Sequence, residues 1–600
     1  MVLVGATVVV ASGSASHAKS QVAAGGTLNV GWEQSFGFTD NGDPTGEYLG
    51  DWFGIASSLL TRTLVGYNHV ADGPGNIVVP DIANPVPTVG NGGITNGGKT
   101  YTFHLRHGIK FGPPVNREIT ATDILTAMKR LANPNDGAEY AFYYSVIKGF
   151  DAGKGKSISG IKIIDPYTMQ FNLTAPTGDF LYRMAMPATT PMPAEVTKCF
   201  EGQAGKYGQD LVSTAGYMIA GMDKVDISSC AAIQPASGYD GQTIYDLVRN
   251  PNYNPATDTK AARQNLPDEF KFVVNASSDD IYNKIEAGQL DMAVSSIPPA
   301  VLKKYSTSAS LKKYFHQNSG DRTWYMYMNL TQPPFDDVHV RRALNWIMDK
   351  AALVQGWGGP TIGQVANHIV PDSMFNNQLA DYKPYGTPGD HGSLAKAKAA
   401  MKGSQYDTKG NGMCSASACR NVLLVADTRQ VDTKMIPVLQ ADAKKIGISF
   451  KLRTVKGAYP TLQTPKNNVA MSERPGWGKD YASASTFFIP LMASYDIIAN
   501  GNPNYSLVGL TPAIAKKVGA KGNITGVPSI DGDITACQAI AAAQPNLHCW
   551  EGLDKKLMTD IVPWIPYLWA TVTRITSTNV TQYVYDQFGT TPSYAHIAVK

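Results

Sequence analysis

Residues 421–452, NVLLVADTRQVDTKMIPVLQADAKKIGISFKL, contain the pattern that decides the fold class. The apolar run at 421–425 predicts a buried strand, and apolar residues at helical spacing over 434–446 predict a helix. Gly447 follows as the residue that ends this helix, and 448–452 predicts a second strand. Two strands joined by a helix in this way pair in parallel, so this part of the chain is α/β.

Length and composition limit the class of protein further. A chain of 600 residues is too long for one hydrophobic core, so several domain-sized units are expected. Hydrophobic residues make up 43% and charged residues 17%, which excludes a largely disordered chain. The formal net charge is only +4 and no segment forms a basic face, so a nucleic-acid-binding protein is not expected.

The N-terminal segment resembles an export signal. Residues 1–11 are almost wholly apolar and small residues follow, with a plausible cleavage region at 16–18. The apolar run is too short to span a bilayer, and no later stretch is long and apolar enough. We therefore interpret 1–24 as a signal-peptide-like segment, with a buried N-terminal strand as the alternative. The protein is expected in the periplasm, at the outer face of the cytoplasmic membrane, or secreted.

The six cysteines agree with export. Sequence proximity favours three disulfides among the fifteen possible connectivities. These pairs are Cys199–Cys230, Cys414–Cys419 and Cys537–Cys549. A zinc site is the rival interpretation, but no pair has C-x-x-C spacing and no histidine completes a set of ligands, so no metal is expected. An even count in loop-like segments of an exported chain indicates disulfides.

One motif is a false lead. Residues 93–100, GITNGGKT, fit the phosphate-loop pattern letter for letter. That chemistry needs a strand before the loop and a helix after it. Here a Pro- and Gly-rich loop comes before, and 99–106 alternates with Tyr101, Phe103 and Leu105 on one face, which predicts a strand. We therefore expect a hairpin turn at this position.

Other segments have clear local signals. Residues 120–131 predict a helix that begins with a capping box, and 161–173 predict a hairpin that turns at Asp165-Pro166. The aromatic-rich 322–330 predicts a strand.

Catalytic signatures are absent from the sequence. It contains neither G-x-S-x-G nor H-E-x-x-H, and its ten histidines are dispersed. The acidic pairs Asp279-Asp280 and Asp336-Asp337 precede predicted helices, where capping and the helix dipole explain them. No activated nucleophile and no cofactor motif remain, so a hydrolase is only a distant alternative.

The most unusual string is residues 474–481, RPGWGKDY. Its glycines would let backbone approach a ligand closely, and its Trp and Tyr offer broad apolar faces. Asp480 could hold a cation and Arg474 an anion. A surface turn with a packed Trp477 explains the residues equally well.

Eight segments in a fixed order resemble the family 5 extracellular solute-binding proteins, the dipeptide- and oligopeptide-type receptors of ABC importers. The resemblance covers nearly all of the chain after the signal-like segment. The segments are 98–111, 120–131, 187–196, 247–253, 285–291, 334–344, 476–481 and 561–566.

The resemblance implies a periplasmic-binding-protein-like fold of type II (cluster C), with two α/β lobes, a hinge and a small extra domain. The implied boundaries are 25–64, 187–320 and 574–600 for lobe I, 65–186 for the extra domain, and 321–573 for lobe II.

The resemblance also implies a ligand site. Asp480 would pair with the ligand's α-ammonium, and the backbone of Gly476, Trp477 and Gly478 would extend a peptide as a strand. Arg474 matches a position that meets the ligand carboxylate in some relatives. The remaining expected contacts are Tyr481, Trp357, and Glu33 and Gln34 of the opposite lobe. After Tyr481 the sequence ASAS departs from the family pattern, which leaves the pocket shape open.

The leading hypothesis is a monomeric, non-catalytic receptor that delivers a peptide or similar small cationic solute to the transmembrane subunits of an ABC permease. No cofactor and no nucleic-acid partner are implied. A receptor for an oligosaccharide, a nickel chelate or an opine in the same fold is the alternative, since Trp477, Tyr481 and Trp357 could also stack on sugar rings.

Overall fold

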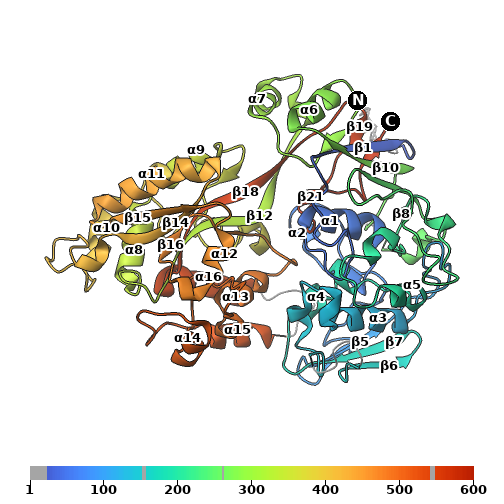
Figure 1. Cartoon of the computed structure of the whole chain (residues 1–600), viewed down its shortest axis with the longest axis horizontal. Coiled ribbons are helices and arrows are strands. Elements are labelled where there is room, and N and C mark those ends of the chain that lie inside the picture. Colours follow the sequence, from blue (N-terminus) through green and yellow to red (C-terminus); the bar gives the residue numbers. More distant parts are fainter. Residues whose placement is uncertain (1–22, 152–156, 260–261, 541–546) are drawn as a thin grey trace, which may run out of the picture.

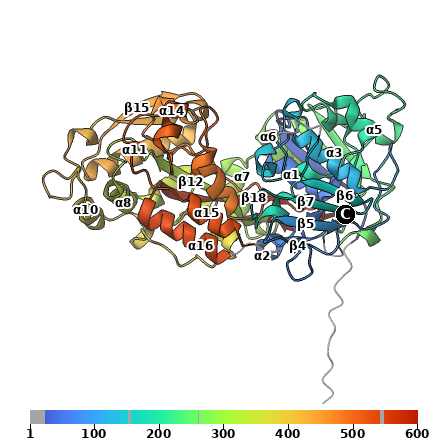
Figure 2. The same cartoon turned by 90° about the horizontal axis from the view of Figure 1, so that it is seen from below.

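The computed structural model describes residues 23–151, 157–259, 262–540 and 547–600. These residues form two α/β bodies side by side (Figures 1 and 2). Nearly all of the predicted signal-like segment, residues 1–22, lies outside the described residues. The α/β class expected from the sequence is confirmed.

The first body is built on a five-stranded sheet with the order β11-β1-β10-β9-β8. Its strands are β1 (Thr27–Glu33), β8 (Tyr217–Ile219), β9 (Ile244–Arg249), β10 (Glu269–Asn275) and β11 (Met292–Ala293). β1 pairs in parallel with both β10 and β11, so a strand near the beginning of the chain bonds to strands more than two hundred positions later. Leu28 and Val30 of β1 are fully buried and anchor it to the core.

The same body holds a four-stranded sheet with the order β4-β5-β7-β6, beside α3 (Figure 2). The bounds are β4 (Ile94–Thr95), β5 (Thr100–His104), β6 (Ile161–Asp165), β7 (Thr168–Asn172) and α3 (Ala121–Leu131). β4 and β5 form a tight hairpin through 93–100, so the phosphate-loop pattern is a turn, as predicted. The β6–β7 hairpin and the capping box at Thr120 and Asp123 are also confirmed.

The second body is built on a seven-stranded sheet with the order β13-β18-β12-β16-β14-β15, and β17 pairs with β12. Its shorter strands are β13 (Gly363–Gln364), β14 (Val422–Asp427), β15 (Phe450–Val455), β16 (Met471–Ser472) and β17 (Gly476–Trp477). β14 and β15 pair in parallel across α11 (Gln430–Lys445), which confirms the predicted strand–helix–strand unit.

Two long antiparallel strands, β12 (Phe315–Met328) and β18 (Trp564–Ile575), run from the second body to the first (Figure 1). Their pairing extends from Phe315 opposite Ile575 to Tyr327 opposite Trp564, with an irregularity between Ser319 and Thr323. The predicted strand at 322–330 overlaps only the second half of β12, which begins at Phe315 and ends at Met328. The expected domain boundaries at 321 and 573 fall inside these strands and stay predictions.

Helices and short strands complete the two bodies. The other α-helices are α1 (Gly50–Ile55), α2 (Asp72–Gly75), α4 (Phe180–Arg183), α5 (Ala194–Thr197), α6 (Ser278–Glu286), α7 (Pro299–Thr307), α8 (Val338–Ile347), α9 (Lys350–Trp357), α10 (Leu394–Met401), α12 (Tyr459–Leu462), α13 (Ser485–Met492), α14 (Pro512–Val518), α15 (Asp531–Gln538) and α16 (Leu547–Lys556). The remaining strands are β2 (Val65–Gly66), β3 (Val79–Pro80), β19 (Val580–Gln582), β20 (Tyr585–Asp586), β21 (Thr591–Pro592) and β22 (Ala598–Val599).

All three predicted disulfides are confirmed. The Cα–Cα distances are 5.2 Å for Cys199–Cys230, 5.8 Å for Cys414–Cys419 and 5.6 Å for Cys537–Cys549. Each lies within the range that a disulfide bridge requires.

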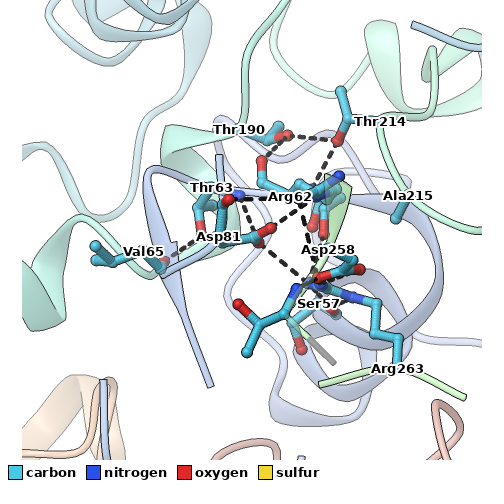
Figure 3. Close-up of polar contacts among 12 residues, drawn as sticks. Ser57, Arg62, Thr63, Val65, Asp81, Thr190, Thr214, Ala215, Asp258 and Arg263 are labelled. Carbon is cyan, nitrogen blue, oxygen red and sulfur yellow. Dashed lines mark hydrogen bonds and ion pairs between the residues drawn. The ribbon is translucent and has the colours of Figure 1, made fainter. Parts of the chain in front are cut away.

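A buried ion quartet ties separate segments of the first body together (Figure 3). The carboxylate of Asp81 lies 2.6 Å from Arg62 and 3.3 Å from Arg263, and Asp258 lies 3.1 Å from Arg263. All four side chains are at most 3% exposed. Burial alone would raise the pKa of Asp258, but the two guanidiniums hold it below its usual value. The quartet therefore fixes residues of 62–81 against 258–263.

Asp81→Asn should lower the free energy of unfolding by about 3–5 kcal/mol, because it leaves two buried guanidiniums facing one carboxylate. Urea unfolding followed by circular dichroism measures this loss. Asp268→Asn is the matched control, since its ion pair with Arg249 is 64% and 44% exposed and contributes about 1 kcal/mol or less. Equal losses in the two variants would contradict a structural role for the quartet.

His368 is a second buried ionic centre, in the second body. Its ring nitrogens lie 3.1 Å from Asp554 and 3.0 Å from Asp372, and the imidazole is fully buried. Burial opposes protonation, but the two carboxylates outweigh it and raise the pKa of His368 to about 9. Asp554 also accepts the backbone N–H groups of Ile369 and Val370, so the imidazolium links this segment to α16.

The stability from His368 should depend on pH. Its pKa of about 9 in the fold exceeds its ordinary 6.5, so the contribution is complete below pH 6.5 and is lost as the pH rises through about 9. The urea midpoint of the wild type should fall over this interval relative to that of His368→Gln, and the difference between the two curves isolates His368. His391→Gln, at an imidazole 67% exposed, should leave the curve unchanged. Parallel curves for wild type and His368→Gln would refute the assignment.

Candidate functional site

The expected ligand segment, residues 474–481, lies on the second body beside the crossing strands. β17 pairs antiparallel with β12 through Trp477 opposite Thr323 and Gly476 opposite Trp324. A Cβ on Gly476 would lie 2.4 Å from the indole of Trp324, so only glycine fits there. The indole N–H of Trp477 donates to the carbonyl of Thr486 at 3.0 Å, which fixes the ring. The segment is thus held rigidly by its neighbours.

Asp480 lies at the end of this segment and contacts the first body. Its carboxylate accepts hydrogen bonds from the hydroxyls of Tyr143 at 2.5 Å, Tyr140 at 3.3 Å and Thr486 at 3.1 Å. Burial raises the pKa of Asp480 to about 6, although these three donors oppose the shift. Within the described chain, no lysine, arginine or histidine forms an ion pair with it. Asp480 is therefore an acid whose partners in the described part of the chain are all neutral hydroxyls.

Tyr481 and its neighbours contact a second carboxylate, Asp179, at the N-terminal end of α4. Asp179 pairs with Arg183 at 2.9 Å and accepts the hydroxyls of Tyr481 at 2.9 Å and Ser485 at 2.6 Å. The amide of Gln538, at the end of α15, donates to it at 2.7 Å. Burial alone would raise the pKa of Asp179, but Arg183, Ser485 and Gln538 outweigh it and lower the pKa. This ionised carboxylate joins the two bodies.

Apolar packing crosses the same boundary. Tyr481 and Ala482 are buried in the hydrophobic core of the first body, in one cluster with Tyr67, Tyr143 and Phe180. The ring of Tyr481 meets that of Tyr143 edge to face, with centroids 5.0 Å apart. Part of the expected site is therefore a contact between the bodies.

Lys479 makes a third contact across the boundary. Its ammonium lies 2.8 Å from Asp321 of β12 and 3.1 Å from the hydroxyl of Thr590, which in turn donates to Asp321 at 2.8 Å. The Lys479 side chain is only 1% exposed. A Cβ on Gly478 would lie 3.3 Å from Asp321, so this glycine also lies against the crossing strand.

Arg474 and Trp357 lie in a cluster of aromatic and cationic side chains. The Arg474 guanidinium lies 3.4 Å from Asp427 and 3.1 Å from the hydroxyl of Tyr459. Trp357 packs on Trp324 with ring centroids 4.5 Å apart. Arg474 and Trp357, which were expected in one site, both lie beside Trp324.

Three guanidiniums surround the indole of Trp324. Arg322, Arg429 and Arg474 lie 5.6, 5.4 and 5.8 Å from its centroid. Arg429 is held by a two-point contact with Asp432 at 2.6 and 2.7 Å. Arg322 is exposed, donates to the carbonyl of Gly476 at 3.2 Å, and forms no ion pair within the described chain. The cluster therefore presents uncompensated positive charge.

Glu473 does not cancel this charge at neutral pH. Its side chain is fully buried, and neither carboxyl oxygen has a hydrogen-bond partner among the described residues. Burial raises its pKa to about 8. The acid beside Arg474 is thus mostly neutral at pH 7.

Glu33 and Gln34, expected from the opposite lobe, lie at the end of β1. Glu33 accepts the hydroxyl of Ser278 at 2.5 Å, and Gln34 has a φ of 63°. In the described part of the chain, neither side chain makes a hydrogen bond or ion pair with residues 474–481. Their contact with a ligand stays a prediction.

The partners of Asp480 were not predicted from the sequence. Tyr140 and Tyr143 belong to the string EYAFYY at 139–144, whose density of tyrosines was the available signal. Nothing in the sequence connects that string to Asp480, which lies 337 positions after Tyr143. The role of Asp179 at the lobe boundary could not be predicted either, because its position before α4 is typical of any helix-capping aspartate.

The described residues contain neither a group of metal-ligating side chains nor a helix that could cross a membrane. No group of three or more His, Cys, Asp or Glu side chains is placed to hold a metal ion within the described residues. Among those residues, no helix has both the length and the hydrophobicity needed to cross a membrane.

Removing the donors to Asp179 from the second body should loosen the contact between the bodies. Each hydrogen bond to a charged acceptor contributes about 1.5–3 kcal/mol, so Ser485→Ala combined with Gln538→Ala should favour an open form. Small-angle X-ray scattering should then give a larger radius of gyration than the wild type has. Thr535→Ala is the control, because this exposed hydroxyl of α15 bonds only within its own helix. Identical scattering from double variant and wild type would contradict the role of Asp179.

Known proteins share this architecture. The chain resembles the solved "Clavulanic acid biosynthesis oligopeptide binding protein 2", with a TM-score of 0.78, 20% identity and 96% of each chain covered. The Haemophilus influenzae OppA complex with the peptide RPPGFSPFR gives a TM-score of 0.61 at 18% identity, covering 97% of this chain and all of that one (100%). At these identities the likeness establishes the fold: a type II periplasmic-binding-protein fold with two α/β lobes.

Proteins that are related in sequence belong to the same group of binding proteins as these structures. The di/tripeptide-binding protein 1 of Pseudomonas aeruginosa is 24% identical over 447 residues, 73% of this chain and 74% of the relative. The periplasmic oligopeptide-binding protein OppA of Escherichia coli is 28% identical over 457 residues, 74% of each. Residues 78–498 match the family described as bacterial extracellular solute-binding proteins, family 5, middle region. The chain therefore belongs to the bacterial extracellular solute-binding proteins of family 5.

Proposed function

We propose that this protein is an exported, non-catalytic receptor that binds short peptides between its two lobes and delivers them to the membrane subunits of an ABC importer. The observation that carries the proposal is Asp480, a carboxylate that has three hydroxyl partners and no cationic partner among the described residues. A protonated amine would supply the missing charge.

The opposite end of the same segment suits a carboxylate. Arg474 and the exposed Arg322 lie around Trp324, with more positive charge than their acidic neighbours compensate. A peptide zwitterion has an ammonium at one end and a carboxylate at the other, so it could bridge Asp480 and this cluster. The two charged ends of residues 474–481 therefore match the two ends of a peptide.

The backbone between these ends also suits a peptide. Within the described chain β17 pairs only with β12, so no strand covers its other edge, and an extended ligand could bond there in place of the Arg322 side chain, which donates to the carbonyl of Gly476. Such main-chain bonding gives affinity without demanding particular side chains. The relatives named for di- and tripeptides and for oligopeptides, and the OppA complex with RPPGFSPFR, support this ligand class.

The hydrogen bonds to Asp179 and Asp480 would couple ligand binding to the opening and closing of the two lobes. Both contacts join the lobes close to residues 474–481. A ligand that favours the closed form shifts the open–closed equilibrium, and the permease would respond to the closed form.

A sugar receptor has less support. Tyr481 is fully buried and therefore cannot offer a face to a sugar ring. Trp357 already packs on Trp324, and the ring of Trp477 is fixed through its N–H group. A neutral sugar would also leave Asp480 without a counter-charge.

Asp480→Asn should weaken the binding of trialanine at pH 7 by about tenfold or more, since a charge-assisted bond of about 1.5 kcal/mol or more is lost. Isothermal titration calorimetry measures the affinity. N-acetylation of the peptide should have the same effect on the wild type and little on the variant. Asp533→Asn, at a surface ion pair with Lys556 on the same lobe, is the control.

The affinity should also depend on pH. Because the pKa of Asp480 is about 6 without ligand, the carboxylate is lost by protonation below that value. Wild-type affinity for trialanine should fall as the pH decreases through about 6, and the affinity of Asp480→Asn should not. A variant that binds the peptide as tightly as the wild type, or follows the same pH profile, removes Asp480 from the site.

A further inference from the structure

Glu473 is a buried acid at the cationic end of the peptide segment. It follows β16 directly, its side chain is fully buried, and neither carboxyl oxygen has a hydrogen-bond partner among the described residues. The hydroxyl of Tyr567 donates to the backbone carbonyl of Glu473 at 3.2 Å, which holds this residue against β18. Burying an unpaired carboxylate is costly, so this environment favours the protonated acid.

The groups that face Glu473 come from several elements. Burial is the main cause that raises the pKa of Glu473 to about 8, and the charge of Asp432 on α11 adds to it. The backbone N–H groups of Glu473 and Asp427 and the guanidinium of Arg429 act in the opposite direction and are outweighed. The hydroxyl of Tyr567 is neutral, because burial raises its pKa well above the usual value. Glu473 therefore exchanges its proton just above neutral pH.

Two of the three guanidiniums around Trp324 are matched by carboxylates. Arg474 lies 3.4 Å from Asp427, which Arg474 and three backbone N–H groups keep ionised by lowering its pKa. Arg429 lies 2.6 Å from Asp432. Each of these pairs contributes no net charge to the cluster.

The third guanidinium, that of Arg322, is left in excess. It is exposed and forms no ion pair within the described chain. Asp321 also interacts with it electrostatically, but this carboxylate is already paired with Lys479 at 2.8 Å. The cluster therefore has one positive charge in excess while Glu473 is protonated, and none once Glu473 ionises.

We propose that the proton on Glu473 sets the net charge of this cluster and thereby controls how tightly the site holds the carboxylate of its ligand. The protonated form leaves the excess positive charge available to the carboxylate, and the ionised form cancels it. Glu473 is a positioning residue in this scheme, since its complete burial keeps it from touching the ligand in the described form. The inference rests on the proposed peptide function and adds a means of regulating that site.

Glu473 and Asp480 together predict an optimum of peptide affinity. Asp480 must be ionised to hold the ammonium, and its pKa is about 6. Glu473 must be protonated to leave the cluster positive, and its pKa is about 8. The affinity should therefore be highest between these two values.

Calorimetric titration with trialanine and with trialanine amide, between about pH 7 and about pH 9, tests the role of Glu473. Both peptides have the same N-terminal amine, so the ratio of their affinities isolates the carboxylate. In the wild type this ratio should fall about fivefold or more as the pH rises through the pKa of Glu473, about 8. In Glu473→Gln, which resembles the protonated acid, the ratio should stay constant. Glu551→Gln, at a buried glutamate of α16, is the control and should follow the wild type.

Infrared spectroscopy tests the proton itself without a ligand. The difference spectrum between the wild type and Glu473→Gln should contain the carbonyl band of a protonated carboxyl group at neutral pH. This band should disappear as the pH rises through the pKa of Glu473, about 8. A difference spectrum without the band at neutral pH overturns the inference even if the peptide binds.

The binding results separate the inference from the function on which it rests. Trialanine that binds the wild type with an affinity ratio independent of pH, or with the same pH profile in Glu473→Gln, overturns the inference alone. Trialanine that binds the wild type at no pH overturns the proposed peptide function and the inference with it.

Discussion

The antiparallel pairing of β12 with β18 is the constraint on which the rest of the molecule depends. The first lobe uses residues from both ends of the chain and its middle, so the chain must pass between the lobes more than once. Two adjacent crossing strands satisfy each other's backbone groups where a lone crossing would leave them unpaired. Relative movement of the lobes must then be absorbed within this pair, and the irregular step between Ser319 and Thr323 is where the ladder is already interrupted.

Three carboxylates at the lobe boundary differ in how they are compensated. Asp179 has Arg183 and three donors, and Asp321 has Lys479 and Thr590. Among the described residues, the side chain of Asp480 has only hydroxyl partners. The first two stabilise the contact whether or not a ligand is present, since their charges are already neutralised. Asp480 also contacts Tyr143 of the other lobe, but it has no cationic partner among the described residues, so of the three it is the carboxylate whose charge an incoming cation would neutralise.

Local patterns in the sequence predicted local structure well. The unit at 421–452, the hairpin at 161–173 and the three disulfides follow from periodicity, turn residues and sequence proximity. The first half of β12 could not be predicted, because 315–321 is polar and has no alternation, and its order comes from β18 far along the chain.

At the candidate site too, the sequence predicted which segment is unusual but not which residues it contacts. Residues 474–481 were found from their unusual composition, but composition does not reveal contacts. That Trp324 excludes a side chain at Gly476, and that Tyr140 and Tyr143 reach Asp480, are consequences of tertiary packing alone. Glu473 gave no signal at all, since only its complete burial makes it unusual.

The disulfide Cys537–Cys549 links the contact between the lobes to the redox state of these two cysteines. Cys537 immediately precedes Gln538, the residue of α15 that reaches Asp179, so the cross-link to α16 fixes the position of that donor. Oxidation of this cysteine pair therefore restrains one of the donors at the lobe boundary. In a reducing compartment the same chain would lack this restraint, so the redox environment in which it matures becomes part of what defines its resting shape.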